Sequence, residues 1–284
     1  MEYLYGLIII VGLYVILATS FNLIIGYGGL VSIAHPVFFA LGAYASAVLS
    51  RDFAVPVPLA MLAGALVALV ASIALALPSL RVSGDYLLIA SIGFQLGLLE
   101  VIKNLRFTGG SSGFINIPPF LIRDVGRESY VGLVLATMVA VILLVRWIAR
   151  SDYGRAMSAM RDDELAFASL GRNAMWMKIA IFGLGSAIAG LAGALYAHYF
   201  RFVTPEQFEI LQSAAILTMV VVGALLLEAL PQALAFLNLP PSVLGPIQGL
   251  LFTGLVLVFM FFRPQGLVPA NDVWRASRKT GEAP

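Results

Sequence analysis

The sequence predicts an all-α protein, a polytopic transmembrane helical bundle of about eight membrane segments, some of them broken or re-entrant. Of its 284 residues, 61% are hydrophobic and 11% are charged, whereas soluble domains have about 45–50% apolar and about 25% charged residues. The excess apolar surface must face lipid. Uncharged stretches of about 20 residues predict helical spans, because a membrane β-barrel would show alternating segments of about 10 residues. This composition excludes a soluble enzyme, a disordered chain and a nucleic-acid binder.

The apolar stretches predict the elements in chain order. We expect spans near 4–25, 35–50, 56–77, 86–104, 130–145, 179–200 and 243–262, with a further apolar stretch at 210–237. No basic residue precedes the first stretch, so it is expected to span the membrane rather than to be removed as a signal peptide. Glu228 and Pro231 interrupt 210–237, which is therefore expected to be re-entrant or broken. Residues 1–284 are predicted to form one transmembrane domain.

Lys and Arg predict the orientation, because cytoplasmic loops are enriched in these residues. The segment 146–178 holds the densest basic cluster, and the tail 263–284 is basic too. Both are expected on the cytoplasmic side of a cytoplasmic (inner) membrane. Alternation of the earlier spans then places the 105–128 loop and the N-terminus outside. Three full crossings after residue 178 would place the tail outside, so one of them is expected to be incomplete.

The predicted cytoplasmic segment 151–177 contains two stretches that favour helix, 154–160 and 164–170. Asp162 and Asp163 suit a helix N-terminus by capping and by their charge, and Gly171 suits a C-terminal stop. A short helix under the membrane that ends at a glycine is suited to receive force from a soluble partner. The alternative interpretation is a charged loop that only connects two spans.

Three glycines, Gly26, Gly28 and Gly29, lie at predicted membrane depth. A non-helical turn at this depth is tolerated where it is buried in protein or lines a cavity. One interpretation is a broken helix beside a translocation path, and the other is a tight loop between the first two spans. Polar and ionisable residues within the spans are candidates for such a path. The candidate path residues are Asn22, Gly28, Ser32, His35, Ser91, Gln95 and Glu228.

Small residues four positions apart predict close packing between membrane helices. Such pairs are Ser186 with Gly190, Ala189 with Gly193, and Gly93 with Gly97. Glu100 is expected to pair with Lys103, one helical turn away. His198 is expected at the membrane interface.

Five stretches, in the same order along the chain, resemble the permeases of ABC importers. Residues 164–171, Glu-Leu-Ala-Phe-Ala-Ser-Leu-Gly, are similar to the cytoplasmic coupling loop of that class. The other stretches are 22–44, 108–113, 189–197 and 262–267. Together they resemble a branched-chain amino-acid ABC-importer permease, of the M type rather than the H type. One departure is that Gly223 leads directly to Ala224, where the family has a further Gly-rich segment.

This resemblance implies a non-catalytic translocation subunit that binds no cofactor itself. The implied partners are a second related permease, two cytoplasmic ATPases that bind ATP and Mg, an extracytoplasmic substrate-binding protein and the lipid bilayer, with no nucleic acid. The implied substrate is a branched-chain amino acid, although similar subunits move urea, short amides or aromatic acids. The residues implied in ATPase coupling are Gly154, Arg155, Arg161, Asp162, Asp163, Glu164, Ala166 and Gly171. The residues implied in docking the binding protein are Thr108, Gly109, Gly110, Ser111 and Gly113, whose glycines also suit a flexible connector.

Motifs for other chemistry are sparse in this sequence. It contains no P-loop and no His-Glu-x-x-His, and with 0 Cys it has no thiolate metal site or Cys nucleophile. No metal site is therefore predicted. Two other classes stay open as alternatives. A stand-alone secondary transporter or channel should work without nucleotide, and a membrane-embedded hydrolase should show a catalytic cluster at membrane depth.

Overall fold

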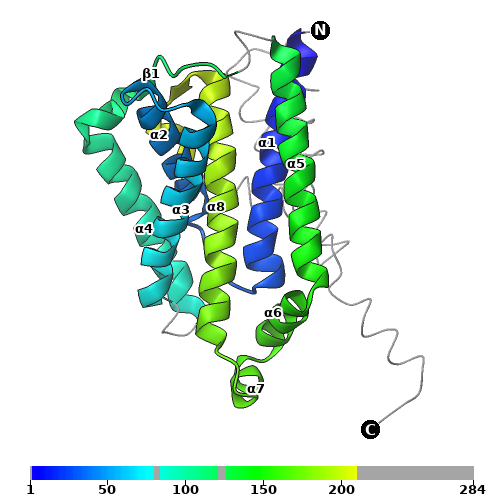
Figure 1. The fold of residues 1–284 in the computed structure, drawn as a ribbon. Coiled ribbons are helices and arrows are strands. Elements are labelled where there is room, and N and C mark those ends of the chain that lie inside the picture. Colours follow the sequence, from blue (N-terminus) through cyan, green and yellow to red (C-terminus); the bar gives the residue numbers. More distant parts are fainter. Residues whose placement is uncertain (1, 80–83, 121–125, 210–284) are drawn as a thin grey trace, which may run out of the picture. The chain divides into compact units, whose positions relative to one another are not determined.

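The computed structural model describes residues 2–79, 84–120 and 126–209 (Figure 1). The chain separates into two compact units, Met1–Leu217 and Thr218–Pro284, and everything described below belongs to the first. Several predictions fall outside the described residues. These are the segments at 210–237 and 243–262, Glu228, the departure after Gly223 and the tail 263–284.

Every span predicted before residue 210 is a helix. These helices are α1 (Glu2–Asn22), α2 (His35–Arg51), α3 (Val57–Ser79), α4 (Gly84–Asn104), α5 (Arg127–Arg150) and α8 (Ala174–Phe200). Among the described residues, the segments long and apolar enough to cross a membrane are Leu4–Tyr27, Val57–Pro78, Leu87–Asn104, Arg127–Arg150 and Ala174–Phe200. The shorter α2, with 17 residues, is largely buried in the bundle. The all-α prediction is confirmed. The predicted total of about eight membrane segments stays a prediction, because some of these segments lie outside the described residues.

Short elements occupy both ends of the bundle. The π-helical turn Leu23–Tyr27 continues α1, and α6 (Asp152–Asp162) and α7 (Glu164–Ser169) connect α5 to α8. The 3-10 turns Arg106–Thr108 and Gly110–Ser112 follow α4, and Pro205–Phe208 follows α8. Strand β1 (Phe114–Ile115) pairs antiparallel with β2 (Phe202–Val203), with Phe114 opposite Val203. Figure 1 shows β1 at one end of the bundle and α6 and α7 at the other.

Helix α8 lies at the centre and packs against α1, α2 and α3. Glycines allow this close approach, since a Cβ on Gly42 would overlap the carbonyl oxygen of Gly190. A Cβ on Gly193 would likewise overlap the carbonyl oxygen of Phe39. The close packing predicted from the small residues of α8 is therefore confirmed.

For α4 the same prediction stays a prediction, because the described part of the chain offers no partner for it. A Cβ on Gly93 or on Gly97 would meet no described atom within 4 Å. The spacing places both glycines on one helix face, but no described helix packs closely against that face.

The connections of the bundle gather at two ends. The Tyr5 hydroxyl donates to Glu128 Oε1 at 2.9 Å, which brings the starts of α1 and α5 together. Residues 105–120 and 201–209 lie at this end, which we call the loop end. Residues 23–34 and 151–173 lie at the opposite end, which we call the coupling end. The predicted alternation of spans agrees with this arrangement, while the side of the membrane that each end faces stays a prediction.

Candidate functional site

The corner between α5 and α6 is fixed by a serine and a glycine. The Ser151 hydroxyl donates to the Ile148 carbonyl at 2.6 Å and accepts from the Gly154 amide at 3.4 Å. Ser151 thereby satisfies backbone groups at the end of one helix and the start of the next. A Cβ on Gly154 would overlap the Ala149 carbonyl oxygen. Gly154 therefore allows the tight corner between α5 and α6.

Helix α7 forms a second capped unit below this corner. Asp163 Oδ1 accepts from the Ala166 amide at 2.9 Å as the N-cap, and the chain turns after α7 at Gly171, with φ of +77°. Lys178 Nζ on α8 lies 2.6 Å from Glu164 Oε1. This ion pair ties α7 to the first turns of α8.

The side chains of the two short helices divide into a buried and an exposed set. Met157, Met160 and Phe167 are buried, whereas Leu165 is 84% exposed and Leu170 is 79% exposed. Exposed apolar side chains on a short projecting segment are suited to contact another protein. Our sequence prediction selected the residues that shape and cap these helices and did not include these two leucines among the coupling residues.

Arg155 and Arg161, both predicted coupling residues on α6, make different contacts. Arg155 is exposed and pairs with Asp152 on its own helix. Arg161 reaches the end of α1, where its Nη1 donates to the Gly26 carbonyl oxygen at 2.6 Å. Asp162 Oδ1 lies 3.3 Å from Arg161 Nε and 3.2 Å from Nη2. The predicted coupling segment therefore directly contacts the glycine-containing turn.

The predicted break after α1 is the π-helical turn Leu23–Tyr27. The Gly28 amide donates to the Leu23 carbonyl, five residues back, at 3.1 Å. A Cβ on Gly28 would lie 2.5 Å from the Ile24 carbonyl oxygen, and Gly29 has a φ of +66°. Turns of this kind are rare and frequently occur at functional sites. The helix therefore ends in an irregular turn before the loop to α2 begins.

His35, the first residue of α2, is buried against α1. Its Nε2 lies 2.8 Å from the Ser20 hydroxyl, and its ring centroid lies 4.6 Å from that of Phe21. In the described part of the chain, His35 Nδ1 and the Ser186 hydroxyl are buried without a hydrogen-bond partner. A Cβ on Gly185 would lie 3.0 Å from the Ser20 carbonyl oxygen. Because unpaired buried polar atoms are rare, the contact of His35 with Ser20 of α1 is a polar interior site, and Ser186 on α8 is a second buried polar group.

The other predicted path residues lie in separate contacts. Ser91 on α4 accepts a hydrogen bond from the Ile33 amide at 2.9 Å, which fixes the loop before α2. Gln95 Nε2 donates to the Phe208 carbonyl at 3.3 Å, closer to the loop end. The remaining described candidates lie in or beside the π-helical turn and its loop: Asn22, Gly28 and Ser32.

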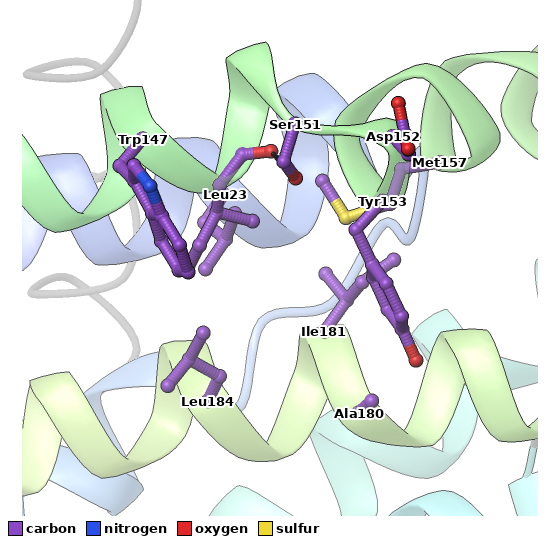
Figure 2. A pocket seen from close by; sticks show the side chains of 10 residues that line it. Leu23, Trp147, Ser151, Asp152, Tyr153, Met157, Ala180, Ile181 and Leu184 are labelled. Carbon is purple, nitrogen blue, oxygen red and sulfur yellow. Dashed lines mark hydrogen bonds between the residues drawn. The ribbon is translucent and has the colours of Figure 1, made fainter.

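An apolar cavity of about 400 Å³ lies among the π-helical turn, α5, α6 and α8 (Figure 2). Figure 2 shows Ile181 and Leu184 of α8 facing Leu23 and Trp147 across this space, with Met157 of α6 at one side. Trp147 and Tyr153, which line the cavity, are exposed, so this space is an open groove at the surface of the bundle beside α6.

The predicted docking loop is a set of tight turns fixed by its own backbone. The buried Thr108 hydroxyl lies 2.7 Å from two carbonyl oxygens at and after the end of α4. Gly109, Gly110 and Gly113 have φ values of +83°, +61° and +81°, a conformation that favours glycine. A Cβ on Gly113 would lie 2.6 Å from the Val203 carbonyl oxygen, beside the β1–β2 pair. These contacts favour a defined surface over a flexible connector.

Apolar side chains are exposed around this loop. Arg51 fixes the strand beneath them, with its guanidinium 3.6 Å from the Phe114 ring centroid and its Nη1 donating to the Ile115 carbonyl at 3.0 Å. The exposed side chains are Phe53, Phe107, Ile115 and Phe202. Ser111 is exposed among them.

Residues 109–113 read Gly-Gly-Ser-Ser-Gly, which matches the Gly-x-Ser-x-Gly spacing of hydrolase nucleophile elbows. Our sequence prediction missed this match. Ser111 lies in the 3-10 turn Gly110–Ser112, and the chain then enters a two-residue strand, so the strand–turn–helix context of an elbow is lacking at this site. Among residues 2–79, 84–120 and 126–209, no group of three His, Asp or Glu side chains is arranged to hold a metal ion.

Two polar residues near the loop end have contacts that the sequence did not predict. His198 is fully buried within the bundle, with Nε2 2.9 Å from the Ser46 hydroxyl and Nδ1 2.8 Å from the Pro118 carbonyl oxygen, while its expected position at the membrane interface stays a prediction. Lys103 pairs with Glu209 at 3.4 Å rather than with Glu100. Both residues contact segments distant in the sequence, which local spacing does not reveal.

The described residues form a bundle of apolar helices, several of them long enough to cross a membrane, with a short capped helical segment at one end. Residues 3–267 match the family described as the permease component of branched-chain amino acid transport systems. The chain belongs to this family. A permease component of a transporter is not itself catalytic.

Curated relatives agree with this assignment. The chain is 31% identical over 302 aligned positions to the high-affinity branched-chain amino acid transport system permease protein LivM of Salmonella typhimurium, covering 95% of this chain and 71% of that protein. The LivM of Escherichia coli is 31% identical, covering 90% of this chain and 68% of that protein. A probable branched-chain amino acid transport permease protein LivM of Methanocaldococcus jannaschii is 28% identical, covering 69% of this chain and 64% of that protein. No solved structure matches the chain.

Proposed function

We propose that this chain is a translocation subunit of an ABC importer that moves branched-chain amino acids inward across the cytoplasmic membrane. Its partners would be a second related permease, two cytoplasmic ATPases that bind ATP and Mg, and an extracytoplasmic binding protein. Family membership and the printed names of the relatives support the substrate class. The exposure of Leu165 and Leu170 on a unit tied to α8 by the Lys178–Glu164 pair is the main support for an ATPase contact.

The loop end would receive the binding protein. The defined turn of residues 108–113 and the exposed aromatic side chains around it support this part of the proposal, because interfaces between proteins are enriched in aromatic anchors. Thr108, Gly109, Gly110 and Gly113 would shape this surface, and Ser111 would lie on it.

The translocation path would pass the contact of α1, α2 and α8. The buried His35, whose Nε2 contacts Ser20 and whose Nδ1 has no partner among the described residues, supports this placement, since polar groups within membrane segments mark substrate pathways. Asn22, Gly28, Ser32, Ser91, Gln95 and Glu228 are the further path residues of the proposal.

The coupling end would face the cytoplasm, with the N-terminus outside and the tail 263–284 inside. The basic cluster at 146–178 supports this orientation. Because the chain has 0 Cys, single cysteines at the exposed positions Ser111 and Ser169 can test it. A membrane-impermeant maleimide should label Ser111→Cys in intact cells and Ser169→Cys only after the membrane is opened. The reverse pattern would overturn the orientation.

The central experiment is co-purification followed by transport. A tagged chain should retain an ATPase and a second permease in detergent, and proteoliposomes of the complex should accumulate leucine only with the binding protein outside and ATP and Mg inside. Uptake of leucine without nucleotide would instead indicate a stand-alone transporter. Uptake of urea, short amides or aromatic acids in place of leucine would contradict the substrate class alone.

A matched pair of variants tests the ATPase contact. We expect Leu165→Ala combined with Leu170→Ala to reduce retention of the ATPase at least several-fold, because these side chains would be buried in the complex. Leu62→Ala combined with Leu143→Ala alters two leucines that are also exposed, at 58% and 60%, but lie on α3 and α5. This control should leave retention unchanged. Equal retention in both variants would contradict the proposed contact.

A further inference from the structure

The side chain of Arg161, in the last turn of α6, reaches the π-helical turn that continues α1. Arg161 and Gly26 are 135 positions apart in the sequence, and Arg161 Nη1 lies 2.6 Å from the Gly26 carbonyl oxygen. A hydrogen bond from a guanidinium is charge-assisted and stronger than one between neutral groups. This contact connects the predicted coupling segment to the first membrane helix.

The acceptor is a carbonyl that the irregular turn exposes. The last carbonyl groups of a helix have no partner within it. Here the Gly28 amide donates to the Leu23 carbonyl at 3.1 Å, and the Gly29 amide donates to the Ile25 carbonyl at 3.0 Å. The next carbonyl, that of Gly26, accepts from Arg161. Arg161 therefore caps α1 from outside the helix.

Two neighbours fix the path of the Arg161 side chain. Gly29, with φ of +66°, leaves room for it, because a Cβ at this position would overlap Arg161 Cγ. Asp162 Oδ1 lies within 3.3 Å of Arg161 Nε and Nη2, so it orients the guanidinium and balances its charge. The Arg161 side chain is 29% exposed, whereas that of Arg155 on the same helix is 74% exposed.

Beside this contact the packing is interrupted. Met157 of α6 and Leu23 of the π-helical turn both line the cavity of about 400 Å³ (Figure 2). Close-packed side chains transmit displacements between elements, and a cavity between two elements weakens that route. The hydrogen bond of Arg161 is therefore a direct mechanical connection between α6 and the π-helical turn.

We propose that Arg161 is a positioning residue that transmits movement of α6 to the π-helical turn and thereby to the loop that leads into α2. This inference rests on the proposed function, in which α6 and α7 respond to ATPases. Arg161 acts from the inner side of the coupling segment, and the exposed leucines act from the outer side. Loss of Arg161 would leave the ATPase bound and hydrolysing ATP while substrate movement stops.

The first test replaces Arg161 in the complete transporter. Arg161→Met keeps an unbranched apolar stem and removes the donors, whereas Arg161→Lys keeps one charged donor group. We expect Arg161→Met to lower leucine uptake per ATP hydrolysed by about tenfold, with co-purification of the ATPase and thermal unfolding unchanged. Arg161→Lys should recover part of the coupling. Arg146→Met, at an exposed arginine of α5, is the matched control and should behave as the wild type.

The second test keeps Arg161 and displaces its side chain. Gly29→Ala should reproduce the low coupling of Arg161→Met, and the double variant should be no worse than either single one, because both remove the same contact. Gly132→Ala is the control, since a Cβ on Gly132 would meet no described atom within 4 Å. If Gly29→Ala and Arg161→Met had additive effects, the shared contact would be refuted.

The outcomes separate this inference from the proposed function. Failure of the wild-type complex to retain an ATPase, or to move leucine with ATP, would refute the proposed function first. A functioning wild type with unchanged coupling in Arg161→Met would refute the role of Arg161 alone. Loss of ATPase retention in Arg161→Met would place this residue in the ATPase contact and also overturn the inference.

Discussion

The loop end and the coupling end of this bundle differ in their backbone pairing. At the loop end, β1 pairs with β2 and His198 bridges Ser46 and the Pro118 carbonyl, beside the longer side chains of Arg51 and Lys103. At the coupling end, the long side chains of Arg161 and Lys178 connect the elements beside a cavity. Long side chains can follow a partner that shifts, whereas backbone pairing fixes its geometry. We expect the loop end to be the more rigid of the two and the coupling end to rearrange.

The largest expected effect is on stability at the loop end. Gly109 has φ of +83°, and a Cβ there would overlap the Gly113 carbonyl oxygen. We expect Gly109→Ala to lower the free energy of unfolding by about 2–4 kcal/mol, because strain and overlap add. Gly97→Ala on α4, where a Cβ meets no described atom within 4 Å, should change it by less than about 1 kcal/mol. Denaturant unfolding in detergent measures the free energy of unfolding of both variants. Equal losses in Gly109→Ala and Gly97→Ala would mean that the loop end is not rigid.

We expect Glu164→Lys to have a smaller effect on the free energy of unfolding and a clear effect on the coupling of ATP hydrolysis to uptake. The pair with Lys178 is partly exposed, with Glu164 at 52%, so its loss should cost about 1 kcal/mol or less. Two like charges would nevertheless push α7 away from α8, and uptake per ATP should fall several-fold. Adding Lys178→Glu restores opposite charges and should restore coupling.

The loop end offers the matched control for this charge reversal. Lys103 and Glu209 form a similar partly exposed pair at 3.4 Å. Lys103→Glu should leave retention of the ATPase unchanged, because this pair lies at the opposite end of the bundle. A loss of ATPase retention in this variant would remove the functional distinction between the two ends.

The helices were predictable from the sequence because length and apolar composition determine a membrane span almost independently of its neighbours. Each predicted span before residue 210 has a corresponding helix, and residues 154–160 and 164–170 correspond to α6 and α7. The break after α1 was predictable as well, since Gly26, Gly28 and Gly29 together oppose a regular helix. These features are local, so local pattern is sufficient to predict them.

Contacts between distant segments were not predictable in the same way. The glycines of α4 have the same four-residue spacing as the small residues of α8, yet among the described residues only those of α8 meet another helix closely, because spacing defines a helix face but not the element that meets it. His198 has no sequence signal for burial, since its partners lie in α2 and in the loop before α5. The contact of Arg161 with Gly26 depends on which carbonyl the π-helical turn exposes. Each of these features requires the packed bundle.

The smallest expected effect on stability concerns the cavity at the coupling end, and it tests whether α6 moves into this space. Ala180 lines the cavity, and Ala180→Leu would fill part of it, which should raise the free energy of unfolding by about 1 kcal/mol or less. If α6 moves into this space during the transport cycle, the same substitution should slow uptake. Ala136→Leu, at an exposed position of α5, should change neither quantity. A gain in stability with undiminished uptake would show that α6 does not need the cavity, and the coupling end would then be loosely packed without being a moving part.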